Sequence, residues 1–201
     1  MSLRTTITPI APYRLDLTAQ ALRRVSSNIV DVLTREGTYL RALRGDGRVN
    51  IVEVQQQTDG LLAVRITGRG ARAHLETVKT LLGTDADLRR WYRRVARFPW
   101  LAALAAHLRG VKPPRYPDLW EALCNGIVFQ QLSIAAASTI MLRLVERFSE
   151  PLEHCGIPLR VFPDPDTIMQ ASDETLLGSV GPQAGSDEAL LAAMNRGRAP
   201  G

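Results

Sequence analysis

Gln130, Gln131 and Ser133 are the residues whose types and spacing are best suited to recognition chemistry in this sequence. They lie in the run Gln130-Gln131-Leu132-Ser133, at the polar corner between two predicted helices. The glutamines therefore come at the end of one helix and just before the N-terminus of the next, an unusual place for long uncharged amides. Two interpretations stay open: the corner is a functional site, or the amides only satisfy carbonyls and N–H groups at the helix ends.

The sequence around this corner, residues 113–148, predicts the two helices that position it. Asp118 is suited to cap the first helix, with Glu121 three residues later closing a capping box. Ser133 is a good N-cap for the second helix. Apolar residues at helical spacing predict the buried face of each helix: Leu119, Leu123 and Ile127 in the first, then Ile134, Ala137, Met141, Leu144 or Val145, and Phe148 in the second.

A basic stretch precedes these helices, because residues 88–117 contain no acidic residue. The basic side chains are Arg89, Arg90, Arg93, Arg94, Arg97, Arg109, Lys112 and Arg115. Arg93 and Arg94 are candidates to neutralise the phosphates of a nucleic acid, and a solvated basic helix face is the alternative. An apolar stripe in the same stretch is expected to be packed: Trp91, Val95, Phe98, Leu101, Leu104 and Leu108.

Residues 12–83 have a different pattern, which predicts an α+β layer. Alternation at residues 13–17 predicts a strand, and a helical stretch is expected from Thr18 through Leu33. Three further strands are expected at 39–44, 49–57 and 61–67, because glycine-containing turns separate these alternating runs. A second helix is expected at roughly residues 71–82.

Composition excludes several classes of protein. The 201 residues are 45% hydrophobic, with 25 basic and 20 acidic side chains and a formal charge of +5. This basic balance suits phosphate contacts, but an arginine-rich and alanine-rich composition can equally reflect the coding bias of a genome. No signal sequence is apparent, and no run approaches the ~20 apolar residues of a membrane span. We expect a soluble, cytoplasmic protein, associated with the nucleoid if it binds DNA.

The cysteine and histidine content predicts no metal site. Cys124 and Cys155 are the only cysteines, and they form neither a disulfide framework nor a zinc or iron–sulfur ligand set. The three histidines are scattered, without acids at ligand spacing.

One family resemblance covers most of the chain. The segment PPRYPDLWEALCNGIVFQQLS at residues 113–133, followed by an alanine-rich helix, resembles the DNA-3-methyladenine glycosylase II family of helix-hairpin-helix base-excision glycosylases. The match extends from about residue 12 to about residue 181. It implies an N-terminal α+β domain, consisting of an antiparallel sheet with two helices, followed by an all-α glycosylase domain that is incomplete here.

The resemblance also implies roles for individual residues. Gln130 matches the position that lines the damaged-base pocket, and Gln131 matches the position that pushes into the duplex where a base has been extruded. A base-flipping enzyme must fill the vacated stack and read the flipped base, and a neutral amide can do either. Trp120 is a candidate wall of the base pocket, although a tryptophan in the first turn of a helix is more often core. Ser133 is included among the DNA contacts.

The sequence departs from the family pattern at its C-terminal end. The hairpin turn, leucine-proline-glycine-x-glycine, and the catalytic aspartate after it should follow Ser172 by tens of residues. Residues 180–185 do not match that turn, and none of four remaining acids has a matching context: Asp173, Glu174, Asp187 and Glu188. No catalytic residue is therefore assigned. The expected division is residues 1–83, residues 84–181, and a non-homologous, disordered tail at 182–201, as in an N-terminal fragment.

The activity implied by the resemblance is hydrolysis of the N-glycosidic bond of an alkylated base in double-stranded DNA. Its transition state resembles an oxocarbenium ion and is stabilised by a carboxylate. No organic cofactor is implied, and any metal would lie at the hairpin. The alternative is a non-catalytic module, either a DNA-binding remnant or an α+β interaction domain.

Overall fold

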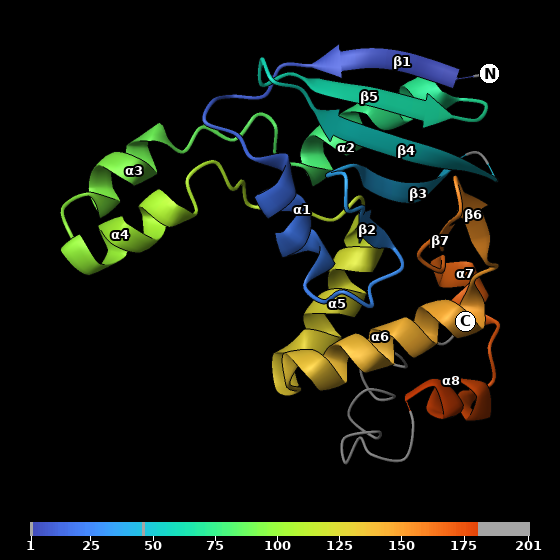
Figure 1. The fold of residues 1–201 in the computed structure, drawn as a ribbon. Helices are drawn as coiled ribbons and strands as arrows, with labels where there is room; N and C mark the ends of the chain where they lie inside the picture. The colour runs from blue at the N-terminus through green and yellow to red at the C-terminus, as the bar shows by residue number, and fades with distance from the viewer. Residues whose placement is uncertain (1, 46, 181–201) are drawn as a thin grey trace. The chain divides into compact units, whose positions relative to one another are not determined.

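The computed structural model describes residues 2–45 and 47–180 (Figure 1). The chain divides into two compact units. Among the described residues, the first comprises 2–26, 31–45 and 47–117, and the second comprises 27–30 and 118–180. The first unit therefore extends past the boundary expected at residue 83. A compact unit need not coincide with a domain of the family, so the expected domain division stays a prediction.

A five-stranded antiparallel sheet forms the framework of the first unit (Figure 1). Its strands lie in the order β1-β5-β4-β3-β2, with bounds Ser2–Ile7, Leu62–Thr67, Arg48–Gln56, Tyr39–Gly45 and Asp31–Leu33. Strands β3, β4 and β5 follow one another in the chain and pair in that order in the sheet, which confirms the predicted meander. At the β4–β5 turn Asp59 accepts a hydrogen bond from the backbone of Leu61 at 3.0 Å, and Gly60 has a φ of 87°. Aspartate and glycine therefore do what the turn requires.

Two helices bury their apolar sides in the core that the sheet forms. Helix α1 (Leu15–Arg23) contributes Leu15, Ala19 and Leu22, and a short 3₁₀ turn, Ala71–Ala73, leads into α2 (His74–Leu81). Alternate residues of β4 and β5 face the same core, so the sheet has one buried face. The α+β prediction of a sheet with two helices is confirmed.

The N-terminal part of the prediction was wrong in detail. Residues 13–17 are not a strand, because α1 begins at Leu15, and the helix ends at Arg23 rather than continuing to Leu33. The missing edge strand is β1, which pairs with β5 from Ser2↔Thr67 to Ile7↔Leu62. Because its partner lies about sixty residues along the chain, no local pattern marks this pairing.

Backbone N–H groups of residues 84–117 donate hydrogen bonds to α1 and α2, which tie this segment to the rest of the first unit. Lys112 donates its backbone N–H to Thr18 Oγ1 at 3.1 Å, and Arg115 donates its own to the carbonyl of Leu81 at 3.2 Å. Between these contacts and α2 lie two short helices, α3 (Arg89–Val95) and α4 (Pro99–His107), which contact each other. These bonds explain why the first unit continues beyond residue 83.

The apolar stripe of α3 and α4 is packed less than we expected. Val95 is buried, Leu101 is half-buried, and the other members of the stripe are exposed. The two helices have only seven and nine residues, and they pack mainly against each other. Two helices this short bury apolar side chains where they contact each other and leave the remaining apolar side chains exposed.

The second unit is built on two longer helices, α5 (Leu119–Gln131) and α6 (Ile134–Phe148). A two-stranded hairpin follows, β6 (Leu152–His154) with β7 (Ile157–Leu159), so this part of the chain is not purely helical. Residues 155 and 156 form its turn at φ values of 51° and 76°, which suits a tight hairpin. Two short helices follow the hairpin, α7 (Pro165–Met169) and α8 (Asp173–Val180).

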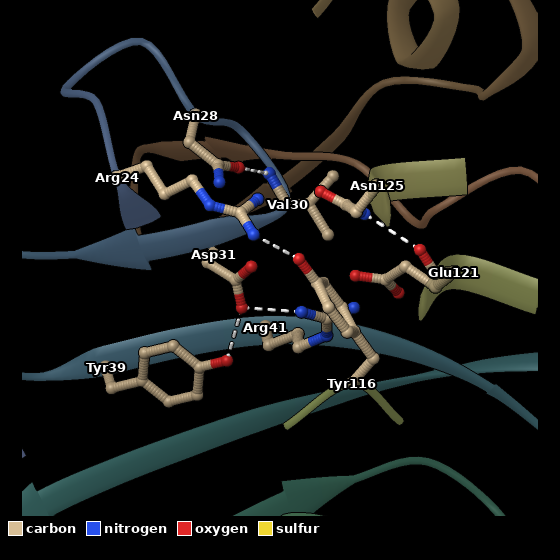
Figure 2. Close-up of polar contacts among 9 residues, drawn as sticks. All are labelled: Arg24, Asn28, Val30, Asp31, Tyr39, Arg41, Tyr116, Glu121 and Asn125. Carbon is tan, nitrogen blue, oxygen red and sulfur yellow. Dashed lines mark hydrogen bonds and ion pairs between the residues drawn. The ribbon is translucent and has the colours of Figure 1, made fainter. Parts of the chain in front are cut away.

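A buried charged cluster lies in the sheet of the first unit (Figure 2). Asp31 Oδ1 accepts hydrogen bonds from Arg41 Nη1 at 2.5 Å and from the hydroxyl of Tyr39 at 2.6 Å. The side chain of Arg41 is 1% exposed. None of the helices that the structure describes is both long enough and apolar enough to cross a membrane.

Candidate functional site

The predicted polar corner is present between α5 and α6. Helix α5 begins after Asp118, whose side chain accepts a hydrogen bond from the backbone of Glu121 at 2.8 Å. It ends at Gln131, and Leu132 is extended. Ser133 Oγ then accepts a hydrogen bond from the backbone of Ala136 at 3.2 Å, which caps α6. The N-caps predicted at Asp118 and Ser133 are confirmed, and they fix where each helix begins, whereas the reciprocal contact of the Glu121 side chain stays a prediction.

The side chain of Gln130 is exposed in the last turn of α5. Among the described residues its amide makes no hydrogen bond, so it does not satisfy a carbonyl or N–H group at either helix end. The amide is consequently free to donate and accept hydrogen bonds with a ligand. Gln131 is the last residue of α5, but its side chain lies outside what the structure describes.

Apolar packing immediately beneath the corner holds the two helices together. Val128 of α5 lies in one cluster with Ala137 and Ile140 of α6, and Phe129 and Leu132 pack against it. Phe129 and Leu132 thus pack against this cluster, whereas the side chain of Gln130 is exposed to solvent. A fixed backbone of this kind gives an exposed amide a defined position.

The buried face of α5 is a different one from the face we expected. Leu119, Leu123 and Ile127 are 72%, 51% and 37% exposed, whereas Glu121 and Asn125 are buried. The buried amide of Asn125 donates to the carbonyl of Glu121 at 2.9 Å. In α6 the prediction holds for Ala137 and Val145, which are buried; Met141, Leu144 and Phe148 are half-buried, and Ile134 is exposed.

Trp120 lies at the opposite end of α5 from Gln130. The two residues are ten positions apart, which corresponds to about 15 Å along a helix axis. The indole Nε1 of Trp120 donates to the carbonyl of Pro163 at 2.9 Å, and the side chain is half-buried. The structure does not bring Trp120 and Gln130 together. The hydrogen bond to Pro163 satisfies the indole N–H, as expected for a tryptophan that packs in the protein interior. A wall of the base pocket at Trp120 stays a prediction.

Arg93 and Arg94 are both exposed on α3 in the first unit, but only Arg93 lines a cleft. Arg90 and Arg109 line the same cleft. Sequence reasoning did not single out these two arginines. The i, i+3 spacing of Arg90 and Arg93 could have identified Arg90 from the sequence. Arg109 follows α4, and its place at the cleft depends on how α4 folds against α3.

The acids, histidines and cysteines in the described part of the chain offer no candidate metal site. No three histidine, cysteine, aspartate or glutamate residues there are grouped so as to hold a metal ion. Asp173 and Glu174 are exposed in the first turn of α8. Asp187 and Glu188, like the predicted tail, lie outside the described residues. Burial raises the pKa of the Cys124 thiol to about 12, with Glu121 adding to the effect, so little nucleophilic thiolate forms at neutral pH.

Sequence comparison gives one match to a curated protein of known activity. DNA-3-methyladenine glycosylase of Bacillus subtilis strain 168 is 33% identical to this chain over 92 residues. The match covers 46% of this chain and 30% of that protein. No protein-family profile matches the sequence.

Solved structures with this fold include further DNA glycosylases. The 3-methyladenine DNA-glycosylase of Archaeoglobus fulgidus superposes with a TM-score of 0.76 at 20% identity, over 94% of this chain and 66% of that one. The 8-oxoguanine glycosylase/lyase of Clostridium acetobutylicum, in complex with double-stranded DNA containing cytosine opposite 8-oxoguanine, gives 0.68 at 14% identity, over 98% and 67%. This chain therefore spans about two thirds of each structure. The resemblance carried by residues 113–133 is confirmed: the chain has the fold of base-excision DNA glycosylases and is similar in sequence to a DNA-3-methyladenine glycosylase.

Proposed function

We propose that this chain is the DNA-recognising part of a base-excision glycosylase that removes alkylated bases from double-stranded DNA. One observation carries the proposal, namely the amide of Gln130, which is exposed at the corner between two capped helices and makes no hydrogen bond to any residue that the structure describes. The comparisons support it, because the sequence relative is named for 3-methyladenine and a structural neighbour was solved on a DNA duplex.

The proposed roles of the two glutamines follow from the chemistry of base flipping. An extruded base leaves a gap in the stack and exposes its hydrogen-bonding edge. Gln130 faces the base pocket, where its amide donates to and accepts from that edge. Gln131 enters the duplex and fills the gap. Neither residue carries charge, so neither stabilises the positive sugar of the transition state.

The N-terminus of α6 provides a proposed phosphate contact beside the corner. Ile134 and Ala135 are exposed in its first turn, and the free N–H groups and positive end of a helix dipole attract anions. Ser133 uses one lone pair of Oγ for the cap. Its hydroxyl hydrogen can still be donated to a phosphate oxygen.

Hydrolysis of the N-glycosidic bond needs a carboxylate at the reacting sugar. We assign that role to no acid of the described chain, and we expect this 201-residue protein to release no 3-methyladenine above background. Release that is abolished by Asp173→Asn or Glu174→Gln would contradict this expectation. The proposed place of action is the cytoplasm, at the nucleoid.

The test compares binding of two duplexes of the same sequence, one undamaged and one carrying an abasic-site analogue. Fluorescence anisotropy gives both affinities for the 201-residue protein and for three variants. Gln131→Ala should lower the preference for the abasic duplex about fivefold, the equivalent of a hydrogen bond worth ~1 kcal/mol. Gln130→Ala should change the preference among alkylated bases placed in the duplex.

The matched control is Gln170→Ala, because Gln170 is also an exposed glutamine at a helix end of the second unit. It should leave both affinities unchanged. If the two corner variants lower the melting temperature and leave the ratio of affinities alone, the amides serve only the helix ends and the proposal fails.

A further inference from the structure

A cleft of about 610 Å³ lies in the first unit, where four arginines meet. Arg89, Arg90 and Arg93 come from α3, and Arg109 follows α4. Arg93 comes four positions after Arg89 and three after Arg90, so it lies on the same side of α3 as each of them. We call this the arginine cleft.

The charges in the arginine cleft are unbalanced. Arg89 is paired with Asp87, with 2.7 Å between Nη2 and Oδ2. Within the described residues, Arg90, Arg93 and Arg109 make no ion pair. Asp87 is the one acid in the lining, so four arginines and one aspartate leave a net charge of +3. Such an excess of positive charge attracts an anion with several charges or a polyanion.

Two contacts fix the inner wall of the cleft before any ligand arrives. The hydroxyl of Tyr92 accepts a hydrogen bond from the backbone of Gly110 at 3.0 Å. The guanidinium carbon of Arg109 lies 5.1 Å from the centre of the Tyr92 ring, a cation–π contact. A guanidinium that is already held loses less conformational freedom when it binds.

The turn at Gly110 is itself fixed to the rest of the first unit. Its carbonyl accepts a hydrogen bond from the backbone of Arg14 at 2.8 Å. The φ of Gly110 is 99°, and an added Cβ would lie 2.7 Å from Cγ of Arg14. Only glycine therefore fits here, and the close approach holds Arg109 beside the cleft.

We propose that the arginine cleft binds a phosphodiester group of the DNA backbone, as a contact separate from the glutamine corner. This inference rests on the proposed function, which makes DNA the partner. Planar guanidinium groups match the paired oxygens of a phosphate. The proposal also predicts different roles for two neighbouring residues. Arg93 contacts the DNA backbone, whereas Arg94, which does not line the cleft, makes no such contact.

The test uses the 201-residue protein and an undamaged duplex, with the affinity measured across a range of salt concentrations. Arg90→Gln, Arg93→Gln and Arg109→Gln should each weaken binding several-fold. Each should also reduce the slope of log K against log salt by about 0.9, the value for one lost phosphate contact. Arg94→Gln and Arg97→Gln are matched controls, because both residues are exposed and neither lines the cleft. They should leave the slope unchanged.

A second arm identifies the source of the phosphate. Inorganic phosphate is added as a competitor at constant ionic strength, and its own binding is measured by calorimetry. The proposal expects weak binding of inorganic phosphate, lost in Arg93→Gln, and tight binding of the duplex through the same residues. Binding of inorganic phosphate alone, with duplex affinity equal in Arg93→Gln and Arg94→Gln, would overturn it.

The outcomes distinguish this inference from the proposed function. If the protein prefers the abasic duplex but the cleft variants behave like the controls, the arginine cleft is wrong and the function stands. If the cleft variants weaken binding but damaged and undamaged duplexes bind equally, the function is wrong and the cleft stands. A wild-type protein that does not bind duplex at low salt would overturn the cleft. Melting temperatures of all variants exclude misfolding as the cause.

Discussion

Arg41 donates a hydrogen bond to Asp31 across neighbouring strands β3 and β2, and both side chains are buried. The pair is directly opposed in the register of the sheet. Tyr39 donates to the same carboxylate oxygen from two residues away on β3. A buried carboxylate is tolerated because both partners are in place (Figure 2).

Removing one partner of this buried pair should strongly destabilise the protein. Asp31→Ala leaves Arg41 in the sheet without its carboxylate, and a loss of about 3–5 kcal/mol in the free energy of unfolding is expected. Urea unfolding measures it. Asp16→Ala is the control, because Asp16 pairs with Arg14 at a more exposed position, and it should cost at most ~1 kcal/mol. Equal losses of unfolding free energy in Asp31→Ala and Asp16→Ala would show that burial does not determine how much an ion pair stabilises this protein.

Stability should decline above about pH 10 because of Tyr39. Burial, reinforced by the neighbouring charge of Asp31, raises the pKa of its hydroxyl well above 10.0. In the unfolded chain the group ionises near pH 10, whereas in the fold it stays protonated. The unfolded state therefore binds fewer protons as the pH rises, and the free energy of unfolding falls. Tyr39→Phe should flatten this decline, measured as urea midpoints between pH 8 and pH 11. An unchanged slope would contradict the prediction.

The two cysteines should differ in reactivity. The pKa of Cys124 is raised to about 12 by its burial, with further contributions from Glu121 and Asp118, so little thiolate exists at pH 8. Cys155 is exposed. Iodoacetamide should label Cys155→Ser, which retains only Cys124, far more slowly than Cys124→Ser. The rate for Cys155→Ser should still be rising with pH between pH 8 and pH 10, where the protein is folded. Rapid labelling of Cys124 in the folded protein at pH 8 would show that the thiol is accessible and ionised.

The helix caps at Asp118 and Ser133 could be predicted from the sequence because a cap is a local interaction, complete within three residues. The buried face of α5 could not. Its most buried residues are Glu121, Asn125 and Val128, and because two of these are polar, the apolar periodicity points to a different stripe. The strand β1 and the arginine cleft were missed for a related reason, since each depends on residues brought together from distant parts of the chain.

The two stripes of α5 should respond differently to substitution. Leu123 is half exposed, so Leu123→Gln should change the free energy of unfolding by less than ~0.5 kcal/mol. Val128 is buried against Ala137 and Ile140, and Val128→Ala should cost about 1–3 kcal/mol because it removes buried methyl groups. Chemical denaturation measures both. The reverse order of losses would show that the expected stripe is the buried one after all.

Trp120 is the residue for which a packing role and a role in base recognition predict separable results. Its indole donates to the carbonyl of Pro163, which precedes α7. Trp120→Phe keeps an aromatic ring but loses this bond, so we expect a loss of ~1 kcal/mol in stability. Trp120→Leu also loses the ring and should cost more.

If the side chain only packs, neither variant changes the ratio of affinities for abasic and undamaged duplexes. If it walls the base pocket, Phe preserves base preference by stacking and Leu does not. Because Trp120 and Gln130 are about 15 Å apart along α5, we expect the first result. Altered base preference in Trp120→Leu, with the preference intact in Trp120→Phe, would place the residue in the pocket.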